Sequence, residues 1–494
     1  MKPIAALPEI EILIGGRELE KKDLACLGSV RVIQRLSSPS LCEAVFTGVD
    51  EGFFDRVPYE KHTPWQVLLA GEALPLFRGV ITAAEYRFDP SGILELYVRG
   101  YDRLYFPGKK QRIHTHVQTT VPEIAREMLK DHGIEPAPGK TGPVWQQEVQ
   151  FRETDLDFLA RIAQRSGLYF FINREEKLEI MDLSPQGNPV VLTRGDNLFE
   201  LSLEVNDAPA LASVYASGWD PFLAKFHEAE AMGEEENGQQ RKLADIALRN
   251  STEAETVCRA ELERCRALEM TARGVAEGDT KLAPGTVVDI EEIPSRLGRK
   301  YLLTEVGHTW SADSGYISEF SSAPPDFRKQ DCGASATFGI VTDINDPENL
   351  GRIKASLPAF ENQESGWLNV VIPAAGQNKG AVMLPDTGDQ ILILFLNNDP
   401  ARGVVVGGIF GSSRQPPDWG IEDGRVMRFC LVTPGGQKFT LDDEAQGVKI
   451  ENSKGSFLEI NPDTVTLGCE TDLSIKAPGK NITITGNKID FQKG

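Results

Sequence analysis

Two short histidine motifs are the first candidates for chemistry in this sequence. His227-Glu228 begins like the HExxH motif, in which two histidines one helical turn apart bind zinc. Ala231 stands where the second histidine is needed, so this motif predicts no zinc pair. His114 and His116 are two residues apart, which places both rings on one side of a strand. Two ligands do not make a metal site, and we expect a surface pair there.

Other motifs that carry chemistry are missing from the sequence. It contains no GxGxxG, no P-loop, no GxSxG and no CxxC pair. The seven cysteines are scattered, and two of them, Cys258 and Cys265, are separated by about 10 Å of helical rise, too far for a disulfide. We expect reduced, mostly buried thiols, and a protein with no catalytic residues, no bound metal and no cofactor.

The composition limits the classes to which the chain can belong. Its 494 residues are too many for one hydrophobic core, so we expect three or four domains. A net charge of −21 argues against binding to a phosphate backbone, which requires a basic surface. No run of eighteen apolar residues is present, and the N-terminus lacks the apolar core of a signal peptide. We expect a cytoplasmic protein without stable membrane insertion of its own, which leaves the cell only inside a larger particle.

Hydrophobic patterning predicts a mainly β, multidomain protein. Short strands alternate with turns in residues 1–108 and return in residues 186–330, which predicts two β-barrel-like hub domains. Residues 109–185 carry helical patterns and a strand, which predicts a small α/β insertion. Six short strands in residues 337–411 fit an OB-fold barrel. A fifth region, residues 430–494, consists of repeated short strands.

The predicted helices have recognisable start signals. Thr120 followed by Glu123 is a capping box, and Thr154 is the N-cap of a second helix. A longer helix is predicted over residues 242–268 in the second hub domain. These helices form the small α-helical part of the chain.

The last 65 residues contain seven segments in which every second residue is apolar. Each segment places two apolar residues on one face, which a thin stack of strands cannot bury alone. Either the chain coils into its own β-solenoid, or several chains surround a common axis. Rungs of about eight residues favour a triple-stranded β-helix or prism, in which seven strands give a shaft on the order of 35 Å long. The predicted shaft core is Phe439, Leu441, Val448, Ile450, Leu458, Ile460, Val465, Leu467, Leu473, Ile475, Ile482 and Ile484.

An ordered series of motif residues occupies the predicted barrel. An Asp-Pro pair precedes a Gly-Arg strand, a Trp strand follows, and Leu-Pro, Gly-Asp and Asp-Pro pairs come later. Together with the helix–strand unit 153–172, this series resembles the spike family that includes VgrG of type VI secretion and the hub and needle proteins of contractile phage tails. The matching positions are Asp346, Pro347, Gly351, Arg352, Trp367, Pro373, Gly376, Pro385, Gly388, Asp389, Asp399, Pro400 and Gly407. We interpret them as fold-specifying, with Arg352 and Asp389 paired either with each other or across a subunit boundary.

The resemblance implies a homotrimeric spike at the centre of a contractile injection system. Its hub would present a nearly sixfold ring to the hexameric inner tube protein, and baseplate proteins and effector cargo would be further partners. Sheath contraction would drive tube and spike through a target envelope. Because no His follows His308, no iron is expected in the shaft; a PAAR-like tip protein would dock on Gly486, Asn487, Lys488, Ile489, Asp490 and Phe491.

Departures from the family pattern refine this expectation. No lysozyme domain separates barrel from shaft, and no toxin follows the shaft in this sequence. That favours an antifeeding-prophage-type system, or a thylakoid or other membrane-anchored one, over a toxin-bearing type VI spike. Two other functions stay open: a tail-associated enzyme that degrades cell walls through its hub, and a nucleic-acid-binding OB protein, which the acidic charge disfavours.

Overall fold

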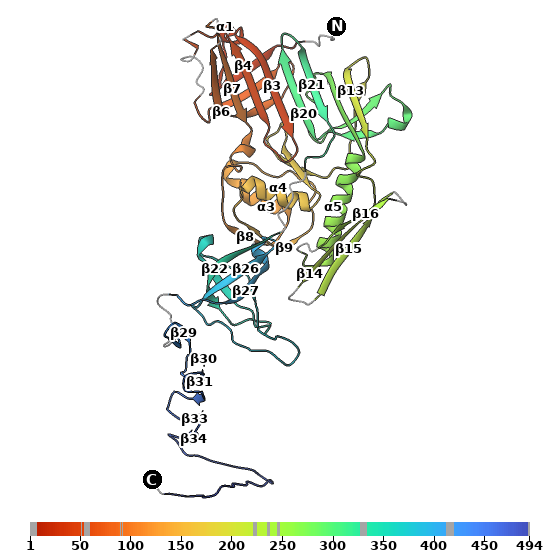
Figure 1. Ribbon diagram of the computed structural model, residues 1–494. Coiled ribbons are helices and arrows are strands. Elements are labelled where there is room, and N and C mark those ends of the chain that lie inside the picture. Colours follow the sequence, from red (N-terminus) through yellow and green to blue (C-terminus); the bar gives the residue numbers. More distant parts are fainter. Residues whose placement is uncertain are drawn as a thin grey trace. The chain divides into compact units, whose positions relative to one another are not determined.

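The computed structural model describes residues 7–50, 52–53, 60–88, 90, 92–220, 225–234, 238–244, 248–326, 333–411 and 419–492. The chain divides into two compact units, Met1–Gly408 and Ile409–Gly494, which are described separately below. Strands dominate both units, so the predicted mainly β, multidomain architecture is confirmed (Figure 1).

One eleven-stranded sheet contains strands from both β regions of the hub. Antiparallel pairing of β20 with β3, in which Gly307 lies opposite Ile33, joins the two regions across the sheet. This pairing also satisfies what would otherwise be two exposed strand edges. In sheet order the strands are β13 (Leu198–Val205), β17 (Met270–Glu277), β21 (Gly315–Ser321), β20 (Glu305–Ser311), β3 (Leu27–Arg35), β4 (Leu41–Thr47), β7 (Leu94–Tyr101), β6 (Phe77–Phe88), β5 (Pro64–Leu69), β1 (Ile10–Ile14) and β2 (Arg17–Glu18).

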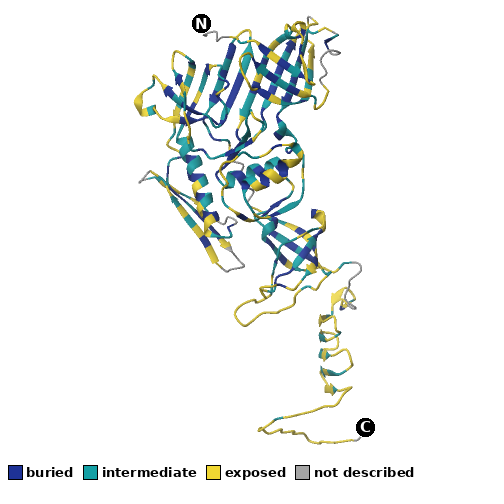
Figure 2. Ribbon diagram, turned by 180° about the vertical axis from the view of Figure 1, so that it is seen from behind, coloured by how far each residue is buried: buried dark blue, intermediate teal, exposed yellow. Residues whose placement is uncertain are grey.

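Alternating side chains build the cores beside this sheet. In β4 every second residue is buried, as the period of a strand requires (Figure 2). Trp65, Ile12 and Val32 belong to the first core, and Tyr301 and Leu303 belong to a second core in the other β region. The short helix α1 (Lys21–Leu24) and a three-stranded sheet of β12 (Val190–Thr193), β18 (Val287–Glu291) and β19 (Lys300–Leu302) complete these regions.

Helices α3 (Val121–Leu129) and α4 (Asp155–Arg165) pack in a core of their own. The capping box is confirmed, because the Thr120 N–H donates to Glu123 Oε2 at 2.8 Å. Thr154 caps α4 as predicted and accepts from the Asp157 N–H at 3.1 Å. The strands beside these helices are β8 (His114–Thr119), β9 (Trp145–Gln150), β10 (Tyr169–Ile172) and β11 (Leu178–Met181).

The third long helix begins later than predicted. Helix α5 spans Ser251–Glu269, with Asn250 as its N-cap, and lies against β14 (Leu211–Asp220) and β15 (Lys225–Met232). The first residues of the predicted helix instead belong to β16 (Gln239–Leu243), because they pair in parallel with β14. Residues 245–247 lie outside the described residues.

The predicted OB segment forms a six-stranded sheet in the order β24-β23-β22-β26-β27-β25. One of the six strands predicted here, the segment AVMLP at residues 381–385, is wrong: this stretch pairs with no strand, and its apolar side chains, such as Val382 at 78%, are exposed. The strands are β22 (Ala334–Asp343), β23 (Lys354–Leu357), β24 (Gln363–Glu364), β25 (Asn369–Val370), β26 (Gln390–Leu396) and β27 (Gly403–Gly408).

The second unit contains a five-stranded antiparallel meander. Its strands are β30 (Arg428–Val432), β31 (Lys438–Asp442), β32 (Gly447–Glu451), β33 (Phe457–Ile460) and β34 (Val465–Gly468), preceded by the small hairpin β28 (Ile421–Glu422) and β29 (Arg425–Val426). Residues 469–492, which include the last three predicted strands, form no strand within the chain. A single-chain solenoid is also not formed by the described residues, because each strand of the meander pairs antiparallel with the next.

Candidate functional site

The meander carries two continuous apolar rows on one of its faces. Directly paired residues share a face, and the register aligns the apolar pairs of all five strands. The first row is Leu431, Phe439, Ile450, Leu458 and Leu467; the second is Phe429, Leu441, Val448, Ile460 and Val465. We call these ten residues the apolar face. Phe429 and Leu431 were missed from the sequence, although their alternation in RFCLV is the same signal.

The opposite face of the meander is mainly polar, with Val432 and Phe457 as apolar residues at one end of their strands. Between the two apolar rows of residues lie Cys430, Thr440, Lys449, Glu459 and Thr466, which are themselves paired in register. The sheet is therefore amphipathic, with one face suited to water and one that is not.

Side-chain caps in the connecting turns fix this register. The Asp442 carboxylate accepts from the Ala445 N–H at 2.8 Å, and Asn461 accepts from the Thr464 N–H at 2.8 Å. In the turn between β32 and β33, the Asn452 side chain likewise accepts from backbone N–H groups. Turns of this kind return the chain after four or five strand residues, which explains why consecutive strands pair with each other.

Nothing among the described residues of the second unit covers the apolar face. No residue from 421 to 492 is buried; Figure 2 shows the meander and the stretch after it in yellow and teal. Of the ten side chains, Leu467 is 57% exposed and Val465 70%. Contiguous exposed apolar surface of this kind marks an interaction site.

The final stretch of the chain is exposed as well. Leu473, Ile475, Ile482 and Ile484, the remaining predicted shaft residues, are each more than half exposed. The predicted tip-docking residues 486–491 lie in the same stretch; Phe491 is 89% exposed, and Lys488 forms an ion pair with Asp490.

The OB signature residues form a local hydrogen-bond centre. The Asp346 carboxylate accepts from the Leu350 N–H at 2.9 Å and from the Arg352 guanidinium at 2.6 and 3.0 Å. These bonds hold the pKa of Asp346 well below its usual range and close the loop between β22 and β23. Gly351 takes a left-handed φ of 72°, which suits glycine. The contacts give this part of the motif a structural role.

The other signature residues also support turns. Asp389 accepts from the Asp386 N–H at 2.8 Å beside Pro385 and Gly388, whereas the ion-pair partners described for Arg352 are Asp346 and Glu348. Asp399 accepts from the Ala401 N–H at 2.9 Å, and Pro400 begins the short helix that Asp399 caps. Trp367 lies with its ring 5.3 Å from the Lys354 ammonium.

Polar contacts connect the OB segment to the rest of the first unit. The Arg249 guanidinium donates to the Ala401 carbonyl at 3.0 Å and to Gln147 Oε1 at 3.2 Å. Nearby, burial raises the pKa of Asp399, and the Glu148 carboxylate adds to this effect. Burial would also raise the pKa of Glu148, but Arg165 and Arg161 hold it below its ordinary value.

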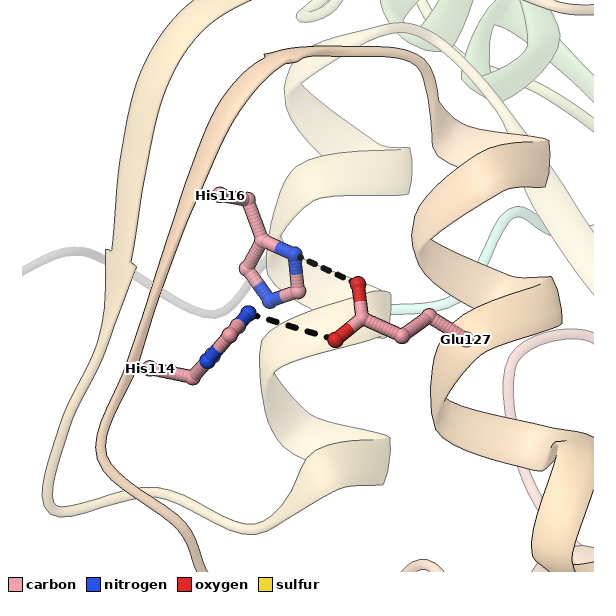
Figure 3. Close-up of side chains that lie close together, drawn as sticks. All are labelled: His114, His116 and Glu127. Atoms are coloured by element: carbon pink, nitrogen blue, oxygen red, sulfur yellow. Dashed lines mark ion pairs between the residues drawn. The ribbon is translucent and has the colours of Figure 1, made fainter.

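The two histidine motifs lie in different environments of the fold. His227 is buried on β15, and Ala231 is on the same strand, so no helical zinc motif forms. His114 and His116 lie on one side of β8, as predicted, but the expected surface pair is wrong because the His116 side chain is only 2% exposed. Glu127 of α3 joins the two rings (Figure 3). Sequence reasoning missed Glu127, since no local pattern links it to β8.

The described cysteines are divided between buried and exposed positions, whereas mostly buried thiols were expected. No disulfide bond joins those that the structure describes, and Cys332 lies outside the described residues. Burial raises the pKa of three thiols, those of Cys42, Cys258 and Cys265. Cys430 and Cys469 of the second unit are exposed. Among the helices that the structure describes, none is long and apolar enough to cross a membrane.

Two family models match this chain in succession. The phage tail baseplate hub (GPD) model matches residues 76–314, and the type VI secretion system/phage-baseplate injector OB domain model matches residues 337–410. The type VI secretion system spike protein VgrG1a of Pseudomonas aeruginosa is 22% identical over 356 residues, which cover 60% of this chain and 54% of that protein. The chain spans about half the length of the curated relatives it matches.

Solved structures share the fold at lower identity. The E. coli c3393 protein, a type VI secretion component described as similar to the T4 phage tail proteins gp27 and gp5, has a TM-score of 0.54 and 15% identity; 81% of this chain and 99% of that chain are covered. The VgrG complex with PdpA from Francisella has a TM-score of 0.57 and 9% identity, covering 94% of this chain and 80% of that chain. The hub and OB models match in this order, and together with these relatives they support a VgrG-like phage tail hub.

Proposed function

We propose that this protein is the central spike of a phage-tail-like contractile injection system, and that it works as a homotrimer. Its role is mechanical: the hub caps the inner tube, and the C-terminal unit forms a stiff shaft that leads the tube through a target envelope. The spike is made in the cytoplasm and carried outward in the assembled particle, of the extracellular or membrane-anchored kind.

The uncovered apolar face carries this proposal. Burying a half-exposed aliphatic side chain contributes roughly 1 kcal/mol, so the ten residues supply on the order of 10 kcal/mol per chain when another surface covers them. Each strand contributes only two apolar residues, so the face is narrow. Three such sheets, apolar faces inward, enclose a thin axis without leaving a cavity, and each chain forms one wall of the prism.

Residues 469–492 support the same assembly. They continue the apolar alternation of the meander, yet their backbone groups have no strand partners among the described residues. Pairing with the same stretch of two other chains satisfies those groups and buries Ile475, Ile482 and Ile484. The shaft is therefore a self-paired prism followed by an intertwined end, where a PAAR-like tip protein covers Ile489 and Phe491.

Neighbouring residues on β31 provide a matched test of the trimer. Leu441 lies on the apolar face and Thr440 on the polar one. Light scattering of the full-length protein should give three times the chain mass of 54.3 kDa for the wild type and for Thr440→Asp, but a monomer for Leu441→Asp. A monomeric or dimeric wild type, or a trimeric Leu441→Asp variant, contradicts the proposal.

The proposed mechanical role requires no cell-wall cleavage by the hub. The purified trimer should release no soluble fragments from peptidoglycan, with lysozyme as the positive control. Release that survives repeated purification would instead favour the tail-associated enzyme.

A further inference from the structure

We propose that His114, His116 and Glu127 form a binding site for a divalent transition metal, with Zn²⁺ as the ion that fits best. The three side chains point toward one another from two elements, β8 and α3 (Figure 3). The inference is independent of the spike function, and it departs from the expectation that the chain binds no metal.

The distances suit a small ion with nitrogen and oxygen ligands. His114 Nε2 lies 3.2 Å from Glu127 Oε1, and His116 Nδ1 lies 3.3 Å from Glu127 Oε2. One ligand atom from each residue lies within 4.8 Å of the other two. Tetrahedral zinc with ligands at 2.0–2.1 Å separates neighbouring ligand atoms by about 3.3 Å, so small side-chain rotations complete the site.

One of the three ligands is buried and held in place, whereas the other two are accessible to solvent. The His116 ring is held against Phe158, with ring centroids 5.2 Å apart, whereas His114 and Glu127 are 41% and 48% exposed. His116 Nε2 is buried and has no hydrogen-bond partner among the described residues. An ion can enter from the exposed side, and a fourth ligand position remains for water.

The local charge permits a cation. Arg112, an arginine whose charge acts on His116, is engaged by Asp155, whose carboxylate accepts from Arg112 Nε at 2.8 and 3.0 Å. Two neutral imidazoles and one carboxylate are a ligand set that zinc uses in proteins. The alternative is a plain ion pair at a half-exposed carboxylate, which contributes about 0–1 kcal/mol and gives no reason for two rings to converge on one carboxylate.

A bound ion connects β8 to α3 and stabilises the fold of this region. Binding to the folded state alone raises the free energy of unfolding by RT ln(1 + [metal]/Kd), so the stabilisation grows with metal concentration. The ligands come from two elements, and a metal in this position acts as a crosslink between them.

Metal titration of the full-length protein tests the site. Untagged protein is stripped with EDTA, dialysed and titrated with Zn²⁺ against a chromophoric chelator. We expect one ion per chain, and a visible absorption band when Co²⁺ replaces Zn²⁺. His114→Ala and Glu127→Gln should each weaken binding by more than about tenfold, since loss of even an outer-shell partner costs that much.

Exposed ligands are chosen for these variants because truncation of His116 leaves a cavity beside Phe158. His62→Asn is the control: it removes an exposed histidine elsewhere, and Asn tolerates the left-handed backbone there. It should bind like the wild type and show the same rise in melting temperature with Zn²⁺. Absence of stoichiometric binding, or equal affinity in His114→Ala and Glu127→Gln, overturns the proposal.

Discussion

His308 is buried in the hub among three hydrogen-bond partners. Its Nε2 lies 2.9 Å from the Leu282 carbonyl, and its Nδ1 lies 3.0 Å from both the Tyr316 and the Ser318 hydroxyls. The carbonyl can only accept, so Nε2 carries the proton and Nδ1 accepts from a hydroxyl. Burial lowers the pKa of His308 to about 4, which keeps the ring neutral in the folded protein.

This residue makes the hub sensitive to acid. The ordinary His pKa is about 6.5, so between pH 6.5 and 4 the unfolded state binds a proton that the folded state does not. The contribution of His308 to the free energy of unfolding has its full value above pH 6.5. It falls by about 3 kcal/mol as the pH drops to 4. Urea unfolding from pH 7.5 to 4.5 should therefore show the stability difference between wild type and His308→Gln shrinking with falling pH. A constant difference would contradict the assignment.

At the scale of elements, β30 offers a test of which face of the meander the proposed trimer buries. Cys430 lies on its polar face, and the adjacent Leu431 lies on the apolar one. In the native protein a maleimide should modify Cys430 readily but modify a cysteine at Leu431→Cys slowly, because the proposed trimer covers the apolar face. Peptide mapping quantifies both positions, and labelling in urea serves as the control. Equal labelling of both positions before urea is added would place the apolar face outside.

At the scale of the whole molecule, the two units differ in how they are stabilised. The first unit contains several buried cores, including that of the OB segment, whereas the second has no buried residue from 421 to 492. Truncation after Gly411 should therefore give a folded monomer. Circular dichroism, thermal unfolding and light scattering measure this outcome. A truncated protein that remains trimeric would show that the hub itself holds the chains together.

Local signals explain what could be predicted from the sequence. A capping box, a period of two and Asp-Pro or Gly-Asp turns act over a few residues; the capping box and the turns formed where the sequence indicated, and so did most of the strands. The helix predicted from residue 242 begins only at Ser251, because the preceding residues pair with β14, a partner that no local pattern reveals. The strand predicted at 381–385 was wrong for the opposite reason, since its alternation has no partner strand.

The sequence by itself determined the mainly β class, the OB motif and the two apolar residues per short strand at the C-terminus. Only the tertiary structure decided that β20 pairs with β3, that α3 brings Glu127 to His114 and His116, and that the apolar pairs align as uncovered rows. Helix caps and strand periods depend on neighbours in sequence, whereas strand register and metal ligands depend on segments that meet only after the chain has folded.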